Sequence, residues 1–70
     1  MRRELKWSDT LELGIAMAER YPGMDPLTVR FTDLHAWVTQ LANFQDDPHL
    51  SNEKLLEAIQ MAWLDEVQDL

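Results

Sequence analysis

Cysteine is absent from the 70-residue sequence, and glycine and proline are scarce, with two and three copies. The absence of cysteine excludes a disulfide framework, a thiolate metal site and a cluster ligated by the chain itself. No apolar run approaches the roughly 20 residues that span a bilayer, and no apolar segment follows Arg2 and Arg3 as a secretory leader requires. We therefore expect a soluble, cytoplasmic protein.

The chain is also short, which limits its architecture. This length predicts a single domain over residues 1–70, without room for a nucleotide-binding α/β fold or a deep enclosed active site. A hydrophobic content of 46% and three tryptophans indicate a folded chain rather than an acidic disordered one. No grouping of serine, histidine and an acid can be argued from spacing, so we expect no enzymatic activity.

Basic residues are rare, and their distribution is uneven. The formal net charge is −7; residues 1–30 hold five acids and five bases, whereas residues 31–70 hold eight acids against Lys54 alone. These acids are Asp33, Asp46, Asp47, Glu53, Glu57, Asp65, Glu66 and Asp69. Such one-sided acidity repels a phosphate backbone and favours a basic protein surface or a hard cation as a partner.

Hydrophobic periodicity predicts three helices and no strand pattern long enough to build a sheet. The first helix is expected to begin at Asp9, which forms a capping-box arrangement with Glu12, and to stop at Tyr21-Pro22-Gly23. Its predicted core stripe consists of Leu11, Ile15 and Ala18, widened by Leu13, Met17 and Tyr21. Gly14 weakens the helix interior, so it indicates either a close packing contact or simple tolerance.

A short turn from Asp25-Pro26 to Val29 is expected next, and Val29-Arg30-Phe31 is the only candidate extended stretch. Thr32 is expected to cap the second helix, which ends by residues 42–43. Its apolar stripe is Leu34, Trp37, Val38 and Leu41.

The third helix follows a polar loop over residues 43–50, in which Phe44 is the expected anchor. Ser51 or Asn52 is expected to cap this helix, which runs to the C-terminal region. One face of it carries Leu56, Ile59, Trp63, Val67 and Leu70, with Leu55 at the edge. The predicted fold class is therefore mainly all-α, a three-helix domain of helix-turn-helix or modified winged-helix architecture.

This architecture is common among DNA-binding proteins, but the charge argues against that function. A DNA reader needs Lys or Arg along its recognition helix to replace condensed counterions. The predicted second helix, residues 33–42, contains neither residue type. We therefore expect no nucleic-acid partner.

Several short motifs occur in a characteristic order. They are Lys6-Trp7, Tyr21-Pro22, Asp25-Pro26, Val29-Arg30-Phe31-Thr32-Asp33 with His35 and Trp37, Asp46-Asp47-Pro48, Ser51-Asn52-Glu53-Lys54 and Trp63-Leu64-Asp65-Glu66. Each is common alone, but their ordered combination resembles the IscX (YfhJ) family of bacterial iron–sulfur cluster assembly proteins, over roughly residues 5–67.

This resemblance implies a small acidic adaptor with a modified winged-helix fold. It implies binding to the cysteine desulfurase IscS, weak binding of Fe²⁺ and modulation of cluster assembly on the scaffold protein, which is reached indirectly. The alternative it leaves open is a frataxin-like metallochaperone whose main role is iron donation. The sequence departs from the family pattern in the loop before Asp46-Asp47-Pro48. This loop is often more acidic in the family than residues 42–45 are here, so fewer carboxylates surround Asp46 and Asp47.

Surface carboxylates without cysteine suit hard cations at low affinity. The candidate iron ligands are Asp46, Asp47, Asp65 and Asp69, and the alternative for each is a solvated acidic face. His49, close to Asp47, is a candidate for a mixed nitrogen and oxygen contact. His35 is expected to be a surface or cap-region histidine rather than a ligand.

The third helix also carries apolar residues on its acidic side. The candidate partner-binding residues are Asp33, Glu53, Glu57, Met61, Leu64, Asp65 and Glu66. Acids there steer a basic partner while Met61 and Leu64 supply a desolvated anchor, or else Met61 and Leu64 belong to the core. Arg30 and Asp33 either pair with each other or present a polar epitope.

The large aromatic residues complete the expected core, because so small a domain needs their burial. They are Trp7, Tyr21, Phe31, Trp37 and Trp63. We expect a monomer with no membrane partner.

Overall fold

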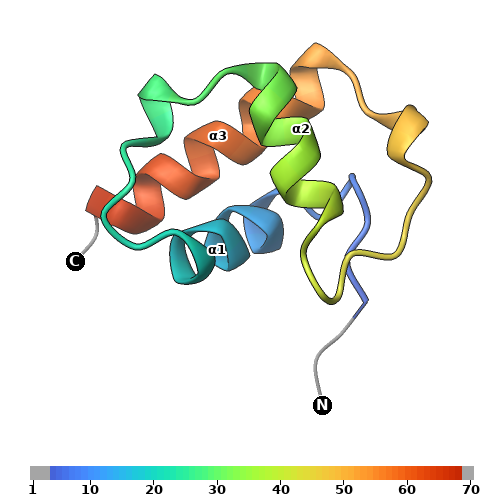
Figure 1. Ribbon diagram of the computed structural model, residues 1–70, viewed down its shortest axis with the longest axis horizontal. Helices are drawn as coiled ribbons and strands as arrows, with labels where there is room; N and C mark the ends of the chain where they lie inside the picture. The colour runs from blue at the N-terminus through green and yellow to red at the C-terminus, as the bar shows by residue number, and fades with distance from the viewer. Residues whose placement is uncertain (1–3, 69–70) are drawn as a thin grey trace.

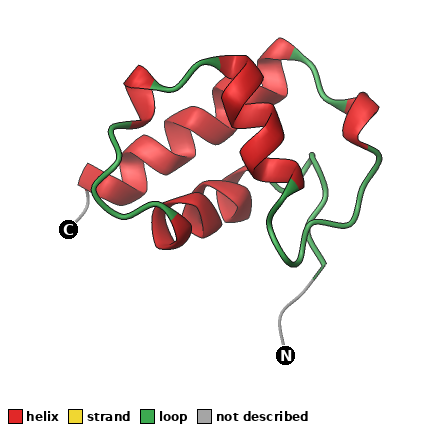
Figure 2. Cartoon of the chain, in the orientation of Figure 1, coloured by secondary structure: helices red, strands yellow, loops and turns green. Residues whose placement is uncertain are grey.

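Three α-helices and two 3₁₀ turns make up the regular structure of this chain in a computed structural model that describes residues 4–68 (Figures 1 and 2). They are α1 (Thr10–Arg20), η1 (Pro26–Thr28), α2 (Phe31–Thr39), η2 (Pro48–Leu50) and α3 (Glu53–Gln68). Among the described residues, the β pairing consists of one isolated parallel bridge between Leu5 and Phe44. The predicted all-α class is confirmed. No helix in residues 4–68 combines the length and apolar content that crossing a bilayer requires.

The ends of α1 fall where its sequence signals predict, but its N-cap differs in detail. Asp9 occupies the N-cap position without a side-chain bond to the helix; its carboxylate accepts the backbone N–H of Lys6 at 2.9 Å instead. The predicted capping bond of Asp9 is therefore wrong. At the other end the helix stops at Arg20, and Gly23 takes a φ of +84°, which turns the chain at low steric cost.

The buried face of α1 agrees with the predicted one in part. Leu13 and Met17, which were expected to widen the stripe, are fully buried, and Ala18 and Tyr21 pack against the core. Leu11 is 65% exposed, so its predicted place in the core is wrong. The reason is Gly14, where a Cβ would lie 2.5 Å from the Ala62 Cβ. The glycine allows α1 and α3 to touch at this point, and the contact turns the flanking Leu13 and Met17 into the core.

α2 is shorter than predicted and begins earlier. Asp25 caps η1 by accepting the N–H of Leu27 at 3.0 Å, as predicted, and the extended Arg30 leads directly into α2. The helix begins at Phe31, so the Thr32 cap is wrong. It ends at Thr39 rather than at residues 42–43, and the N–H of Gln40 bonds back to α2 carbonyls, including that of Ala36 at 3.2 Å.

The connection from α1 to α2 spans residues 21–30 and contains η1. It is longer than the 3–4-residue turn that joins the two helices of a helix-turn-helix. This longer connection gives η1 room to lie on α3, where the Gln60 side-chain amide donates to the Pro26 carbonyl at 2.9 Å.

The N-cap of α3 is one of the two residues predicted from the sequence, Ser51 and Asn52. The Asn52 side-chain oxygen accepts the Leu55 N–H at 2.9 Å, which identifies Asn52 rather than Ser51 as the N-cap. Leu56, Ile59 and Trp63 are buried along the predicted face. Leu70 lies outside the described residues.

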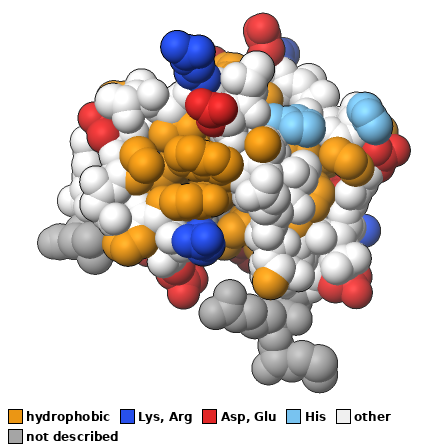
Figure 3. Space-filling model, in the orientation of Figure 1, with side chains coloured by type: hydrophobic (Ala, Val, Ile, Leu, Met, Phe, Trp, Pro, Cys, Tyr) orange, Lys and Arg blue, Asp and Glu red, His pale blue; other side chains and the backbone are white. Residues whose placement is uncertain are grey.

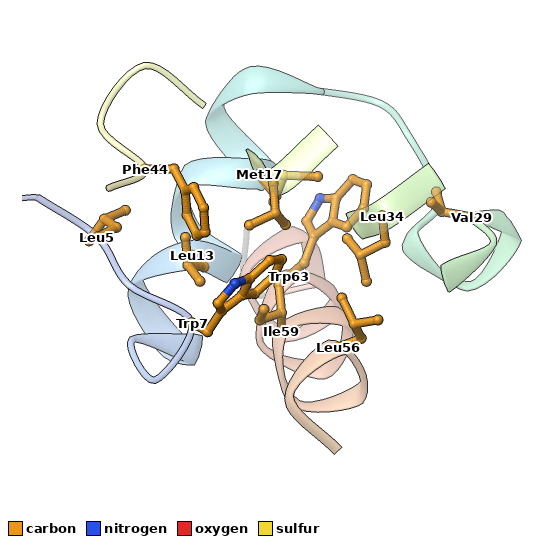
Figure 4. Close-up of a cluster of buried hydrophobic side chains, with 11 residues drawn as sticks. Leu5, Trp7, Leu13, Met17, Val29, Leu34, Phe44, Leu56, Ile59 and Trp63 are labelled. Carbon is orange, nitrogen blue, oxygen red and sulfur yellow. The ribbon is translucent and has the colours of Figure 1, made fainter. Parts of the chain in front are cut away.

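Side chains from all parts of the chain fill the core. Figure 4 shows Trp7 from the N-terminal segment and Trp63 from α3 projecting into one cluster with Phe44 and Leu34. Trp7 and Trp63 are 2% and 0% exposed. The predicted core position is confirmed for them, whereas Tyr21, Phe31 and Trp37 are only half-buried and pack against the outside of the cluster.

Candidate partner-binding surface

The outer face of α3 is acidic and partly apolar. Glu53, Glu57 and Asp65 are exposed, and Lys54 is the one cation of this helix. Met61 is 46% exposed and therefore lies outside the core, whereas Leu64 is half-buried. Of the two interpretations of Met61, the surface one agrees with its position.

The predicted partner-binding residues do not form one continuous patch. At about 100° per residue, Glu57 and Glu66 point to opposite sides of α3. Two shallow hollows flank this helix on these two sides. One is lined by Phe31, Thr32, His35, Glu53 and Leu56. The other is lined by Leu11, Ala62, Asp65, Glu66 and Gln68.

Asp33 lies apart from both hollows, exposed in the first turn of α2. Within the described part of the chain, no ion pair joins it to Arg30, although both side chains are exposed. The predicted pairing of these two residues is therefore wrong, and the alternative of a polar epitope stays a prediction.

A different apolar area occupies the face toward the viewer in Figure 3, between α2 and the end of α1. At the end of α1, the ring of Tyr21 stacks on that of Trp37 in α2 with centroids 4.6 Å apart. The guanidinium of Arg20 lies 5.0 Å from the centre of the Tyr21 ring. A cation therefore lies beside this aromatic pair, whereas both charged residues that line the hollow at Asp65 are acids.

Asp46 holds the N-terminal segment rather than facing solvent freely. Its Oδ2 accepts the Trp7 N–H at 3.0 Å and its Oδ1 accepts the Asp47 N–H at 2.8 Å. These two backbone donors, that of Trp7 first, hold the pKa of the Asp46 carboxyl below its usual range. The indole Nε1 of Trp7 also donates to the Asp47 carbonyl at 2.7 Å. We refer to these three bonds of Trp7, Asp46 and Asp47 as the Trp7 clasp.

The predicted iron ligands are dispersed. The Oδ1 of Asp47 accepts the His49 N–H at 2.9 Å and lies 3.3 Å from the His49 Nδ1, so these two side chains meet as the sequence suggested. Over residues 4–68, however, no group of three or more histidine or acidic side chains is arranged to hold a metal ion. Asp69 lies outside the described residues. The weak iron site stays a prediction.

His35 has a structural position. Its ring stacks on Trp7 with centroids 5.3 Å apart, and its Nε2 lies 2.6 Å from the Pro48 carbonyl. Because a carbonyl oxygen only accepts, Nε2 carries the proton in this contact. The ring thereby connects α2 to the Trp7 clasp and to η2. His35 is half-buried in the middle of α2 rather than at a helix cap.

The sequence placed Leu11 in the core and offered Asp46 as a candidate metal ligand or part of a solvated acidic face. In the structure Leu11 lines a hollow together with Ala62 of α3, and Asp46 accepts a hydrogen bond from Trp7, 39 residues earlier in the chain. No sequence signal marks the bond from the Trp7 backbone N–H to Asp46. The indole N–H of Trp7, which needs an acceptor when buried, donates to the Asp47 carbonyl instead.

Comparison of the sequence with known proteins identifies the family of this chain. Residues 5–68 match the model of a family described as iron-sulphur cluster assembly. The chain is similar to an uncharacterised protein of Pseudomonas aeruginosa, with 53% identity over 62 residues that cover 89% of this chain and 94% of the relative. The matched range contains the Trp7 clasp, all three helices and the two hollows beside α3. The chain belongs to the iron-sulphur cluster assembly family of IscX-like proteins.

Proposed function

We propose that this protein is a non-enzymatic cytoplasmic adaptor that docks on a basic surface of the cysteine desulfurase and modulates cluster assembly. Membership of the family supports the pathway. The observation that carries the adaptor role is the concentration of charge, with eight acids against Lys54 in residues 31–70. Five of these acids, on α2, in the loop after it and on α3, are exposed: Asp33, Asp47, Glu53, Glu57 and Asp65.

The acids and the apolar residues of α3 have different roles in this proposal. Exposed carboxylates raise the rate of encounter with a positive surface, and this effect weakens as salt is added. Met61 supplies apolar area beside them, which is the kind of group that retains a partner after encounter. The same face repels nucleic acid.

The experiment measures the affinity for purified desulfurase at several salt concentrations, with paired charge reversals. E57K/D65K changes the net charge from −7 to −3, since each reversal adds two. We expect its dissociation constant to rise about tenfold at low salt, which corresponds to 1.4 kcal/mol, and its salt dependence to flatten.

The matched control is E4K/E19K, which makes the same change of net charge at two exposed acids outside α3. We expect it to alter the affinity less than threefold, about 0.6 kcal/mol. Equal losses in the two double variants would show that net charge alone matters and that α3 is not the docking surface. Unchanged affinity of E57K/D65K at low salt would remove the proposal.

Weak binding of Fe²⁺ is the second part of the proposal. Open carboxylate oxygens hold hard cations without a rigid cage, so the affinity is expected to be low. Asp47 and Asp65, which are exposed, are better candidates for iron ligands than Asp46, because both carboxylate oxygens of Asp46 accept hydrogen bonds from backbone N–H groups. An anaerobic titration followed by NMR tests this: paramagnetic broadening should begin at these two residues, and uniform spectra would exclude the site.

A further inference from the structure

α1 carries a second apolar stripe that does not enter the core. Leu11 is 65% exposed and Ile15 is half-buried, and the two lie four residues apart on one side of the helix. The core side of the same helix is formed by Leu13 and Met17, which are fully buried. Leu11 is the most exposed of the large hydrophobic residues in the described chain.

The position of Leu11 follows from the way the two helices touch. The close approach of Gly14 to Ala62 leaves Leu11, three residues before the glycine, at the edge of the contact. Leu11 and Ala62 there line a hollow together with Asp65, Glu66 and Gln68, which we call the Leu11 hollow. Its apolar side comes from α1 and the point of contact, and its polar side from the last turns of α3.

The charge of the Leu11 hollow has one sign. Both charged side chains that line it, Asp65 and Glu66, are acids. The last described turn of α3 contains no basic residue to offset the partial negative charge of the helix C-terminus. Negative side chains and the helix dipole therefore add at the same place, beside an exposed leucine.

We propose that the Leu11 hollow receives an apolar side chain carried between lysines or arginines on the surface of the desulfurase, with Leu11 as the anchor on this side. This inference rests on the proposed function and adds the contact point and the chemistry of the segment that is bound. A second copy of this chain is a poorer occupant, because a symmetric contact would place Asp65 and Glu66 against their own counterparts. A phosphate-bearing surface is repelled for the same reason.

The chain offers matched controls for the test. Leu27 and Leu50 are each 61% exposed, against 65% for Leu11, and neither lines the Leu11 hollow. We expect L11A to raise the dissociation constant for the desulfurase about tenfold, as a central apolar anchor does. L27A and L50A should remain within twofold of the natural chain. Because Leu11 is exposed in the first turn of α1 and alanine favours helices, L11A should keep its thermal stability.

A second measurement does not depend on the desulfurase. The probe is a short synthetic peptide with one leucine between two pairs of lysines, compared with the same peptide in which serine replaces leucine. In ¹H–¹⁵N and methyl spectra, the leucine peptide should shift signals of Leu11, Ala62 and Asp65 more than those of Leu27 and Leu50. The serine peptide and the L11A variant should each lose most of this difference.

The two measurements separate the possible failures. If the desulfurase binds the natural chain but L11A behaves as L27A and L50A do, the Leu11 hollow is not the anchor and the proposed function stands. If the desulfurase does not bind while the peptide selects the hollow, the proposed function fails and the site remains for another basic partner. Shifts spread evenly over the acidic residues, without preference for Leu11, overturn the inference.

Discussion

The carboxylate of Asp46 shows how one residue can look like a metal ligand in the sequence and act as a structural group in the fold. Two adjacent acids before a proline resemble part of a cation-binding site. However, both carboxylate oxygens of Asp46 accept hydrogen bonds from backbone N–H groups, those of Trp7 and Asp47. Trp7 is 2% exposed, and it stacks on His35 and meets Phe44 edge to face at 4.9 Å. The carboxylate of Asp46 therefore holds Trp7 in place, and Trp7 in turn packs against Phe44 and His35.

The lowered pKa of Asp46 gives the first prediction. A carboxyl whose pKa is lower in the folded state stabilises the fold fully above the unfolded value of about 4, and this contribution is lost as the pH falls through the lower folded value. We expect thermal stability to fall between about pH 4 and the more acidic folded pKa. D46N should be less stable than the natural chain at pH 7 and should lose part of the acid dependence.

The Trp7 indole N–H signal reports the clasp directly, because this group donates to the Asp47 carbonyl at 2.7 Å. It should move in the same acid range and should already be displaced in D46N at pH 7. D33N, at an exposed acid on α2, is the control and should leave the signal in place. An indole signal that ignores both the acid and D46N would show that the carboxylate does not hold the segment.

Substitution of Gly14 by alanine tests whether packing or helix propensity determines stability at this position, because the two predict changes of opposite sign in the free energy of unfolding. In an open helix, glycine to alanine stabilises by about 1 kcal/mol. Here the new Cβ would lie 2.5 Å from the Ala62 Cβ and 2.7 Å from α3 backbone atoms. We therefore expect G14A to destabilise by about 1–3 kcal/mol, as overpacking does, measured by urea unfolding.

A second substitution identifies the obstacle. A62G removes the nearest atom but leaves the α3 backbone at 2.7 Å, so it should rescue G14A only in part. A stable G14A single variant would contradict the close contact between α1 and α3. The Leu11 hollow would then also need a different explanation, because the same contact places Leu11 at the edge.

At the scale of the elements, local signals predicted helix type and several ends correctly. Pro22 and Gly23 mark the end of α1, Asp25 caps η1, and Asn52 caps α3. α2 was misplaced at both ends because no residue marks them: it starts from the extended Arg30 without a side-chain cap and stops at Thr39 with neither glycine nor proline nearby.

Leu11 of α1 was misassigned to the core for a related reason. Periodicity counts apolar side chains, and it gave no weight to Gly14, which has none and nevertheless faces α3. Contacts between distant segments, such as the Leu5–Phe44 bridge and the bond from Trp7 to Asp46, leave no periodic trace at all. The sequence therefore names the candidate acids, whereas the fold is needed to place Glu53 at one hollow and Asp65 and Glu66 at the other.

The start of α3 supplies a prediction that tests an alternative left by the sequence. The side-chain oxygen of Asn52 accepts the Leu55 N–H at 2.9 Å, as an N-cap does. N52A should lose about 1 kcal/mol of stability, or about 4–8 °C in Tm. S51A should lose less than half of this. Equal losses would mean that both residues share the cap.

On the scale of the whole molecule, the negative charge that is proposed to recruit the partner also destabilises the folded state. A chain with a net charge of −7 repels itself when it is compact, and salt screens this repulsion. Asp65 contributes at an unfavourable point, since it lies in the last described turn of α3, where the helix dipole favours cations. We expect D65K to stabilise the protein by about 0.5–1 kcal/mol at low salt, or about 3–6 °C.

This gain should shrink as NaCl is raised towards 0.5 M, because the Debye length falls well below 10 Å. The neutral variant D65N should gain about half as much, which separates charge from side-chain shape. If D65K were less stable than the natural chain, Asp65 would have an unrecognised stabilising contact. If it is more stable and binds the desulfurase more weakly, stability and binding oppose each other at this residue, as expected where a carboxylate is retained for a basic partner.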